Sequence, residues 1–232
     1  METIININNE NLANYIMFKL DKIDNKFTEE ELNNIYEVII NYNDENDDSS
    51  TFLNELKKLK KLRSITLRNG YIYNNDYNIF HSLSNLFELI FDNCEFEGFE
   101  SFSLLNLKSL SFINCKIDDF SFINDFKALE ELTIVNGNVE INKINSFNKL
   151  RYLQLSYSNI LDNDGINIST LEELYVDNTN MYNFEFVNNL SNLKKISIDK
   201  KQYNTKIGLF KSLKKKNILI LNENMVEFDG DN

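Results

Sequence analysis

The chain lacks proline and tryptophan altogether and holds only 6 glycines among its 232 residues. This scarcity of proline and glycine excludes a linker protein built from those residues. With 2 cysteines, a disulfide framework is excluded as well. A single histidine leaves little material for acid–base catalysis or metal binding. Stability must therefore come from an apolar core, for which a hydrophobic content of 42% is sufficient.

Long apolar runs are also missing. No stretch of about 18 apolar residues occurs, so we expect no membrane span. Residues 1–10 lack a basic segment followed by an apolar run, so we expect no signal peptide. These features favour a monomeric cytoplasmic protein, and secretion by a route without an N-terminal signal stays open.

The formal net charge is -12, which disfavours nucleic acid as a partner because phosphate binding requires a basic surface. The charge is uneven along the chain. Residues 194–216 hold nine lysines and one acid, Asp199, so this segment carries +8 and the remainder carries −20. We expect the lysines to form a solvated terminal face, and a docking patch for an acidic partner is the alternative.

One short pattern recurs about every 22 residues. Residues 107–117 read Leu-Lys-Ser-Leu-Ser-Phe-Ile-Asn-Cys-Lys-Ile, which fits L-x-x-L-x-L-x-x-N/C-x-L, the signature of a leucine-rich repeat. The pattern starts at eight positions, Ile35, Leu62, Leu86, Leu107, Leu129, Leu150, Leu171 and Leu193. The residues three and five places later are apolar in every copy, and they predict one strand per repeat. A ninth strand follows, with either Ile218 and Ile220 or Leu219 and Leu221 pointing inward.

The ninth position of the pattern predicts a second ladder, in which small polar side chains donate hydrogen bonds to backbone carbonyls of the turn after each strand. It is occupied by Asn43, Gly70, Cys94, Cys115, Gly137, Ser158, Thr179 and Lys201. Asparagine is abundant throughout the chain and suits tight turns, because it tolerates the left-handed backbone conformation.

The N-terminal residues differ from the repeats. Residues 9–24 predict a helix that places Leu12, Ile16, Leu20 and Ile23 on one face. Thr28 and the glutamate three residues later predict a capping box for a second helix. We interpret residues 1–34 as a helical N-terminal cap and residues 35–232 as a solenoid of about nine strands, together one domain. The acidic residues 43–50 predict a solvated loop.

A family resemblance rests on residues 117–132, Ile-Asp-Asp-Phe-Ser-Phe-Ile-Asn-Asp-Phe-Lys-Ala-Leu-Glu-Glu-Leu, and on the helical segment that precedes the first strand. This repeat resembles the 22-residue repeat of internalin-like bacterial proteins and of the SDS22-like class. The resemblance implies an α/β fold, a right-handed leucine-rich-repeat solenoid with a parallel sheet on its concave face and short turns on its convex face. The expected core includes Phe120, Phe122, Ile123 and Phe126 of the return segment.

Candidate catalytic and metal-binding residues are few. Cys94 and Cys115 occupy the ladder position of consecutive repeats, and the only histidine, His81, lies in a return segment, so we expect buried structural thiols. Residues 162–165, Asp-Asn-Asp-Gly, have some character of a calcium loop but lack its later glutamate, so we expect a turn. We expect no enzyme activity, no metal and no cofactor.

The concave face offers the binding site that we expect. Alternation places three tyrosines and three acids on it: Tyr152, Tyr157, Tyr175, Glu131, Glu173 and Asp177. An aromatic platform inside an acidic rim suits a protein partner with exposed basic and apolar side chains, although strand propensity alone also explains tyrosine there. The sequence predicts a noncatalytic protein–protein interaction scaffold. A regulator or inhibitor subunit of an enzyme, and a surface or secreted adhesin or effector of internalin type, are the alternatives.

Overall fold

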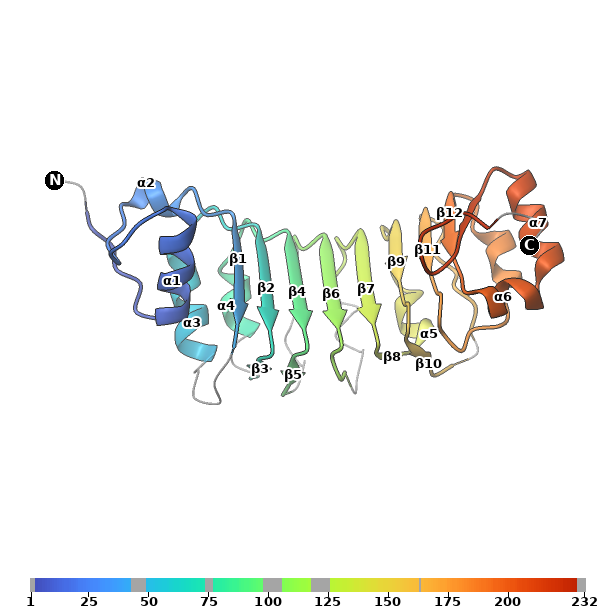
Figure 1. The fold of residues 1–232 in the computed structure, drawn as a ribbon, viewed down its shortest axis with the longest axis horizontal. Coiled ribbons are helices and arrows are strands. Elements are labelled where there is room, and N and C mark those ends of the chain that lie inside the picture. The colour runs from blue at the N-terminus through green and yellow to red at the C-terminus, as the bar shows by residue number, and fades with distance from the viewer. Residues whose placement is uncertain are drawn as a thin grey trace.

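The computed structural model describes residues 3–42, 49–73, 77–97, 106–117, 126–162 and 164–228. Within this part of the chain, nine parallel strands form one sheet in which each strand pairs with the next repeat's strand (Figure 1). They are β1 (Glu37–Asn41), β2 (Ser64–Arg68), β4 (Glu88–Asp92), β6 (Ser109–Ile113), β7 (Glu131–Val135), β9 (Tyr152–Gln154), β11 (Glu173–Tyr175), β12 (Lys195–Ser197) and β13 (Leu219–Leu221). This order is that of a solenoid, as the repeat pattern predicts.

The predicted inward positions are confirmed in all eight repeats. Leu110 of β6 aligns with Leu89 on one side and with Leu132 on the other, and the same alignment continues through the sheet. All of the predicted inward side chains, from Val38 in the first repeat to Ile198 in the eighth, are buried. Each contributes roughly 1.5–3 kcal/mol when it leaves water, so the repeat pattern is also the main source of stability.

In the ninth strand Ile220 points inward as predicted, but the strand is shifted by two residues against its neighbour. Ile220 is fully buried and aligns with Ile196, so Ile220 holds the first inward position, where the repeat pattern predicts Ile218. Ile218 is only partly buried, and Leu219 is 37% exposed. The shift arises because two helices, α6 (Lys200–Thr205) and α7 (Ile207–Lys215), lie between β12 and β13 and lengthen this repeat.

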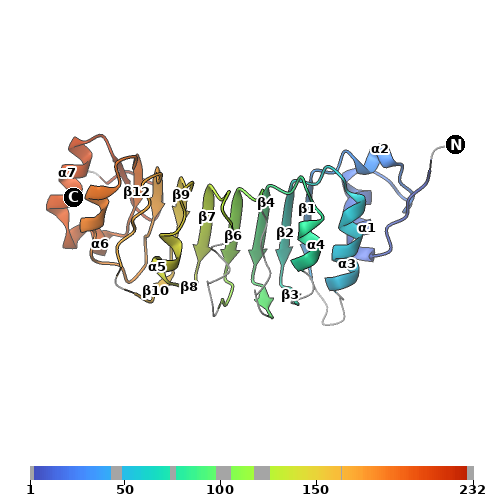
Figure 2. The same ribbon diagram turned by 180° about the vertical axis from the view of Figure 1, so that it is seen from behind.

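The return segments form the second layer. Figures 1 and 2, seen from opposite sides, place α3 (Ser49–Glu55), α4 (Tyr77–His81) and α5 (Ile141–Ile144) on one side of the sheet. The 3₁₀ turns η1 (Leu56–Lys58) and η4 (Glu185–Asn189) belong to other return segments. Fully buried phenylalanines fill the space between the layers, among them Phe52, Phe80, Phe126 and Phe184. The predicted core residues Phe120, Phe122 and Ile123, and most of the acidic insertion, lie outside the described residues.

Two short parallel pairs follow the strands of the main sheet. β3 (Tyr71–Ile72) pairs with β5 (Glu95–Phe96), and β8 (Asn138–Val139) pairs with β10 (Asn159–Ile160). They lie where the chain turns away from the sheet, so neighbouring repeats stay aligned beyond the end of each main strand.

The N-terminal residues form two helices. In α1 (Glu10–Lys19) the Asn9 side chain accepts a hydrogen bond from the Leu12 N–H, and α2 (Glu29–Leu32) begins with the predicted capping box. α1 lies beside β1 (Figure 1). It ends before residue 24, because Asp21 has φ 52°, so Ile23 is fully exposed instead of buried as we expected. The boundary of the cap at residue 34 and the right-handed sense of the solenoid stay predictions.

Among the described residues, no helix combines the length and the apolar character that crossing a membrane requires.

Candidate functional site

The outward face of the sheet is formed by the strand residues that alternate with the buried ones. On β9 and β11, the rings of Tyr152 and Tyr175 lie with centroids 5.1 Å apart and planes tilted by 39°. The Tyr152 hydroxyl donates a hydrogen bond to Gln154 Oε1 at 2.8 Å, and the Tyr175 hydroxyl donates to Glu173 Oε2 at 2.7 Å. Both phenols are therefore held in fixed positions by residues of their own strands.

Lys195 of β12 completes this cluster. Its ammonium donates to Glu173 Oε2 at 2.9 Å and to the Tyr175 hydroxyl oxygen at 3.3 Å, and it lies 5.9 Å from the centre of the Tyr175 ring. The hydrogen bond to Glu173 raises the pKa of Lys195. Burial acts to raise the pKa of Glu173, but the hydrogen bonds from Lys195 and Tyr175 outweigh it and lower that pKa. We call Tyr152, Glu173, Tyr175 and Lys195 the tyrosine–lysine cluster.

Burial raises the pKa of both phenols, and the negative charge of Glu173 acts in the same direction. At neutral pH the cluster therefore holds two neutral phenols, one carboxylate and one ammonium. None of these groups is set up as a nucleophile or a general base. The arrangement suits recognition by contact and hydrogen bonding.

The six residues predicted from the sequence lie in different environments. Tyr152 and Tyr175 contact one another as expected, but Tyr175 is only 6% exposed. Asp177 is 5% exposed, and its Oδ1 accepts hydrogen bonds from the Ser156 and Ser197 hydroxyls, both at 2.9 Å. Asp177 therefore joins three consecutive repeats.

The remaining predicted residues are more accessible. Glu131 is exposed, and Glu173 is half-buried within the tyrosine–lysine cluster. Tyr157 is 57% exposed and lies in the turn after β9, on the rim of a recess lined also by Asn114, Asn136 and Asn138. Tyr157 thus belongs to the edge of the sheet, past the strand ends, and Tyr152 belongs to the outward face.

Sequence reasoning missed Lys195 as a member of the site. Lys195 aligns with Glu173 across the β11–β12 pair. Aligning the sequences of consecutive repeats places these two residues at the same position, and this predicts that they are neighbours. The place above the Tyr175 ring, where the sequence predicts a cation of the partner, is held by the chain's own Lys195.

A row of ion pairs runs along the edge where the strands begin. Arg151 Nε lies 2.8 Å from Glu172 Oε1, Lys194 pairs with the same carboxylate, and Lys108 pairs with Glu130. The hydrogen bond from Arg151, followed by that from Lys194, lowers the pKa of Glu172 to about 2. Such exposed pairs add little stability, but they fix the charges beside a shallow pocket of 200 Å³ that Tyr152 also lines.

A second aromatic group lies at the same edge, nearer the N-terminus, and was also missed. Tyr36 and Phe87 are 43% and 52% exposed, and the Arg63 guanidinium lies 5.8 Å from the centre of the Tyr36 ring. These residues precede β1, β2 and β4 and occupy equivalent positions in three consecutive repeats. Tyrosine and arginine are enriched among residues that dominate binding energy.

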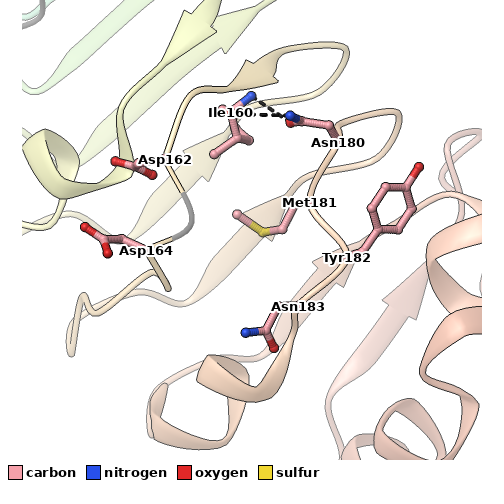
Figure 3. Close-up of a pocket in the computed structure, with 7 residues that line it drawn as sticks. All are labelled: Ile160, Asp162, Asp164, Asn180, Met181, Tyr182 and Asn183. Atoms are coloured by element: carbon pink, nitrogen blue, oxygen red, sulfur yellow. Dashed lines mark hydrogen bonds between the residues drawn. The ribbon is translucent and has the colours of Figure 1, made fainter.

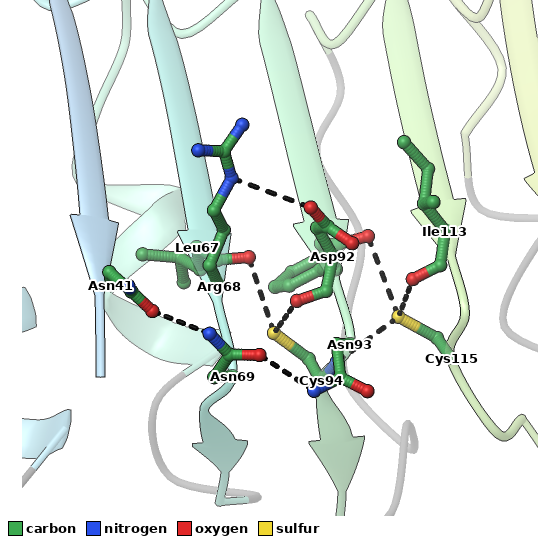
Figure 4. Close-up of polar contacts among 10 residues, drawn as sticks. Asn41, Leu67, Arg68, Asn69, Asp92, Asn93, Cys94, Ile113 and Cys115 are labelled. Atoms are coloured by element: carbon green, nitrogen blue, oxygen red, sulfur yellow. Dashed lines mark hydrogen bonds and ion pairs between the residues drawn. The ribbon is translucent and has the colours of Figure 1, made fainter. Parts of the chain in front are cut away.

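The two thiols are structural, as predicted (Figure 4). The Cys94 thiol donates to the Leu67 carbonyl at 3.3 Å, and the Cys115 thiol donates to the Ile113 carbonyl at 3.3 Å. Burial raises the pKa of Cys94 to about 11 and that of Cys115 to about 12. Both are therefore protonated at neutral pH and are poor nucleophiles.

The hydrogen-bond ladder continues toward the C-terminus with one correction. The Ser158 hydroxyl donates to the Ile134 carbonyl at 3.0 Å, but in the last repeat Gln202, and not Lys201, takes the ladder position. Gln202 is fully buried and its amide donates to the Val176 carbonyl at 2.9 Å. Gln202 replaces Lys201 in the ladder because α6 begins here, with Asp199 as its N-cap. Lys201 then points outward, over the ring of Tyr182.

Asp162 and Asp164 line a pocket of 320 Å³ (Figure 3). Asp162 Oδ2 accepts a hydrogen bond from the Asn142 N–H at 3.0 Å, and Asn180 holds the Ile160 backbone through its side-chain amide. These contacts give Asp162 and Asn180 structural roles between neighbouring repeats; the turn expected at residues 162–165 includes residue 163, which lies outside the described residues. Within the described ranges, no group of three His, Cys, Asp or Glu residues is placed to hold a metal ion.

No protein-family model matches the chain, and no curated protein sequence matches it. Solved structures do. An internalin, inlF, of Listeria monocytogenes matches over 96% of this chain and 91% of its own, with 16% identity and a TM-score of 0.50. Internalin C2 of the same organism matches over 98% and 92%, with 14% identity and a TM-score of 0.51.

A third match is the internalin-like protein lmo2027 of Listeria monocytogenes, with a TM-score of 0.59, 17% identity, and coverage of 86% of this chain and 64% of that one. At these identities the similarity is one of fold. It agrees with the repeat pattern, with the nine-stranded parallel sheet and with the resemblance noted from the sequence. The chain has the leucine-rich-repeat fold seen in the internalins.

Proposed function

We propose that this protein is a noncatalytic recognition scaffold that binds a protein partner on the outward face of its sheet. The observation that carries the proposal is the tyrosine–lysine cluster, an aromatic pair held by three hydrogen bonds on that face, with a fourth between Lys195 and Glu173. Side chains fixed before binding lose little conformational entropy on association, which favours affinity. Tyrosine in particular offers a large rigid contact area together with one polar group.

The charge of the outward face supports a basic partner. Glu37, Glu88, Asp92 and Glu131 all occupy outward positions of the central and N-terminal strands. Arg68 pairs with Asp92 at 3.4 Å, and Lys195 pairs with Glu173, so part of this negative charge is balanced internally. The remaining carboxylates would steer a partner that carries exposed lysine or arginine.

The partner's apolar contacts would fall on two groups. One is the half-buried ring of Tyr152 in the tyrosine–lysine cluster, and the other is the exposed group of Tyr36, Arg63 and Phe87. Tyr152 lies on β9, and the other three residues lie just before β1, β2 and β4, far from β9 in the sheet, so an elongated or curved partner surface would reach both groups. We therefore favour a folded protein over a short peptide as the partner.

The test is a capture experiment with the tagged protein in a lysate of its own cell, followed by cross-linking and mass spectrometry of the complex. We expect cross-links from Lys195, on the outward face, and from Lys108, beside it, to outnumber those from Lys214 and Lys216 at the C-terminal end of α7. Cross-links that come only from the lysines of α7 would place the partner on the basic C-terminal end and overturn the proposal. Size-exclusion chromatography of the free protein checks the proposed monomer.

Two alternatives differ in the partner's identity. Recovery of an enzyme whose activity falls on binding would favour a regulator or inhibitor subunit. Recovery of a cell-surface protein of another organism would favour an adhesin or effector. This alternative is considered because the matched structures are internalins. The proposed cytoplasmic location is tested by fractionating the cells that produce the protein.

A further inference from the structure

Past the ends of the strands, the same backbone conformation recurs in six consecutive repeats. Asn69, Asn93, Asn114, Asn136 and Asn178 have φ between 54° and 58°, in the left-handed region that asparagine tolerates. Tyr157 occupies this place in one repeat, with φ 61°. A bulky side chain is strained in this conformation, and Tyr157 is 57% exposed, so burial does not offset the strain. Strained residues of this kind cluster at functional sites.

Tyr157 lies in a groove of 280 Å³ that crosses three repeats. One row of its lining is formed by the left-handed residues Asn114, Asn136 and Tyr157, at the eighth position of the repeat pattern. The second row lies two residues further along each repeat and consists of Lys116, Asn138 and Asn159. Between the rows lie Cys115 and Gly137. The groove therefore presents three similar rungs, each with one side chain on either side.

The four amides of the groove are ordered. Asn136 Nδ2 donates to Asn114 Oδ1 at 3.1 Å in the first row, and Asn159 Nδ2 donates to Asn138 Oδ1 at 3.3 Å in the second. The register of β8 with β10 keeps Asn138 beside Asn159. An asparagine side chain has two donors and two acceptor lone pairs, so one such bond leaves each amide with capacity for a ligand. All four asparagines are exposed.

The amides select a ligand rich in groups that both donate and accept hydrogen bonds, with an apolar surface for the tyrosine ring, and Lys116 adds one cation to the second row. From the spacing of the rungs we propose that the groove binds a linear oligosaccharide of about three sugar units. Neighbouring strands are about 4.8 Å apart, close to the advance per sugar in an extended glycan chain. Hydroxyl groups would pair with the amides, and the C–H face of one sugar would lie on Tyr157.

An extended peptide fits this groove less well. It advances about 3.3 Å per residue, so successive residues fall out of step with rungs about 4.8 Å apart. The groove also lies past the strand ends and is separate from the outward face proposed for protein binding. The inference is therefore independent of that proposal.

The test uses two β-1,4-linked trisaccharides, cellotriose and chitotriose, titrated into the ¹⁵N-labelled protein. We expect shifts of the Asn114, Asn136, Asn138 and Asn159 side-chain amide signals with one of the two sugars. Tyr157→Asn, which restores the residue found in the other repeats, should weaken binding at least tenfold and raise the melting temperature. Tyr157→Phe should bind within about threefold of the parent chain, because the stacking face is kept.

Asn69→Ala is the matched control, since Asn69 has the same left-handed conformation outside the groove. It should leave the affinity for sugar unchanged. Two results would overturn the proposal: no shift of the groove amides at millimolar concentration of either trisaccharide, or equal binding by the folded Tyr157→Asn variant. Displacement of the sugar by an extended peptide with higher affinity would assign the groove to peptides instead.

Discussion

The Lys195 ammonium lies 5.9 Å from the centre of the Tyr175 ring and 3.3 Å from its hydroxyl oxygen. The same ammonium pairs with Glu173, so one side chain of β12 fixes two side chains of β11. This cross-strand contact depends on the repeat, because residues 22 positions apart come to lie side by side. The surface of such a scaffold is built from residues of adjacent repeats. The pKa values of paired groups such as Glu173 and Lys195 report these contacts and can be measured.

The first prediction concerns acid stability. The folded pKa of Glu172 and that of Glu173 lie below the ordinary value of 4.5. Their contribution to stability is therefore fully present above pH 4.5 and is lost as the pH falls toward about 2, where Glu172 titrates. Lys195→Ala should return the Glu173 pKa toward its ordinary value and leave Glu172 unchanged, since Arg151 and Lys194 hold Glu172. Carboxyl NMR titration measures both, and an unchanged Glu173 pKa in the variant would contradict the network.

The second prediction concerns the thiols. Because the folded pKa values of Cys94 and Cys115 are about 11 and about 12, against an ordinary 9.0, native labelling should be slow at neutral pH. Raised thiol pKa values favour the folded state below pH 9 and cease to do so as the pH rises through 11 to 12. Cys94→Ser should cost little, because a serine hydroxyl can donate to the same carbonyl. Rapid modification of both thiols in the native protein would contradict this burial.

The third prediction concerns cooperativity. Leu132 of β7 is fully buried between Leu110 and Leu153 of the neighbouring strands. Leu132→Ala should therefore destabilise the protein by about 2–5 kcal/mol. In a repeat array each unit contacts only its neighbours, so the C-terminal repeats should lose amide-exchange protection before the N-terminal ones. Thr133→Ala on the outward face is the control and should change stability by less than about 0.5 kcal/mol. A uniform loss of protection would show one cooperative unit.

The fourth prediction concerns backbone strain at Tyr157. Its φ of 61° matches that of the asparagines in neighbouring repeats, yet a tyrosine is unfavourable there. Tyr157→Asn should therefore raise the free energy of unfolding by about 1 kcal/mol. Tyr71→Asn, at another exposed tyrosine, is the control and should not stabilise the protein. Chemical denaturation measures both, and a loss of stability in Tyr157→Asn would mean that the ring makes compensating contacts.

Much of the fold could be predicted from the sequence because the repeat fixes the phase of each strand. An inward residue such as Leu132 is flanked by outward residues, and the period of about 22 residues aligns it with Leu110 and Leu153. The turns were predictable as well, since Asn93 and its equivalents tolerate the left-handed backbone that the repeat requires. These features depend on local chemistry that is repeated many times.

The failures lie where the repeat is interrupted. Ile23 fits the periodicity of α1, but the left-handed turn at Asp21 ends the helix before it. The helix α6 begins after Asp199, which moves the ladder position to Gln202 and alters the register of β13. The burial of Tyr175 was not predictable either, because it arises from contacts with side chains of neighbouring strands, which alternation does not determine.

The last prediction concerns the binding face. Tyr152 is half-buried and lies beside Tyr175, so Tyr152→Ala removes accessible aromatic surface. It should weaken partner binding by more than about 1 kcal/mol and leave the protein folded. Tyr175 is nearly buried, so Tyr175→Phe is the better variant there, because it removes only the hydroxyl that binds Glu173 and Lys195.

Lys214→Ala and Lys216→Ala are the controls for this experiment, since these lysines lie at the end of α7, away from the outward face. Affinities measured by titration calorimetry with the captured partner, alongside circular dichroism of each variant, separate lost binding from lost folding. Because the carboxylates of the outward face would steer a basic partner, higher salt should slow association of the parent protein. Affinity that survives Tyr152→Ala and disappears in the lysine variants would place the docking surface at the basic end of the solenoid, and the tyrosine–lysine cluster would then serve only to join β11 to β12.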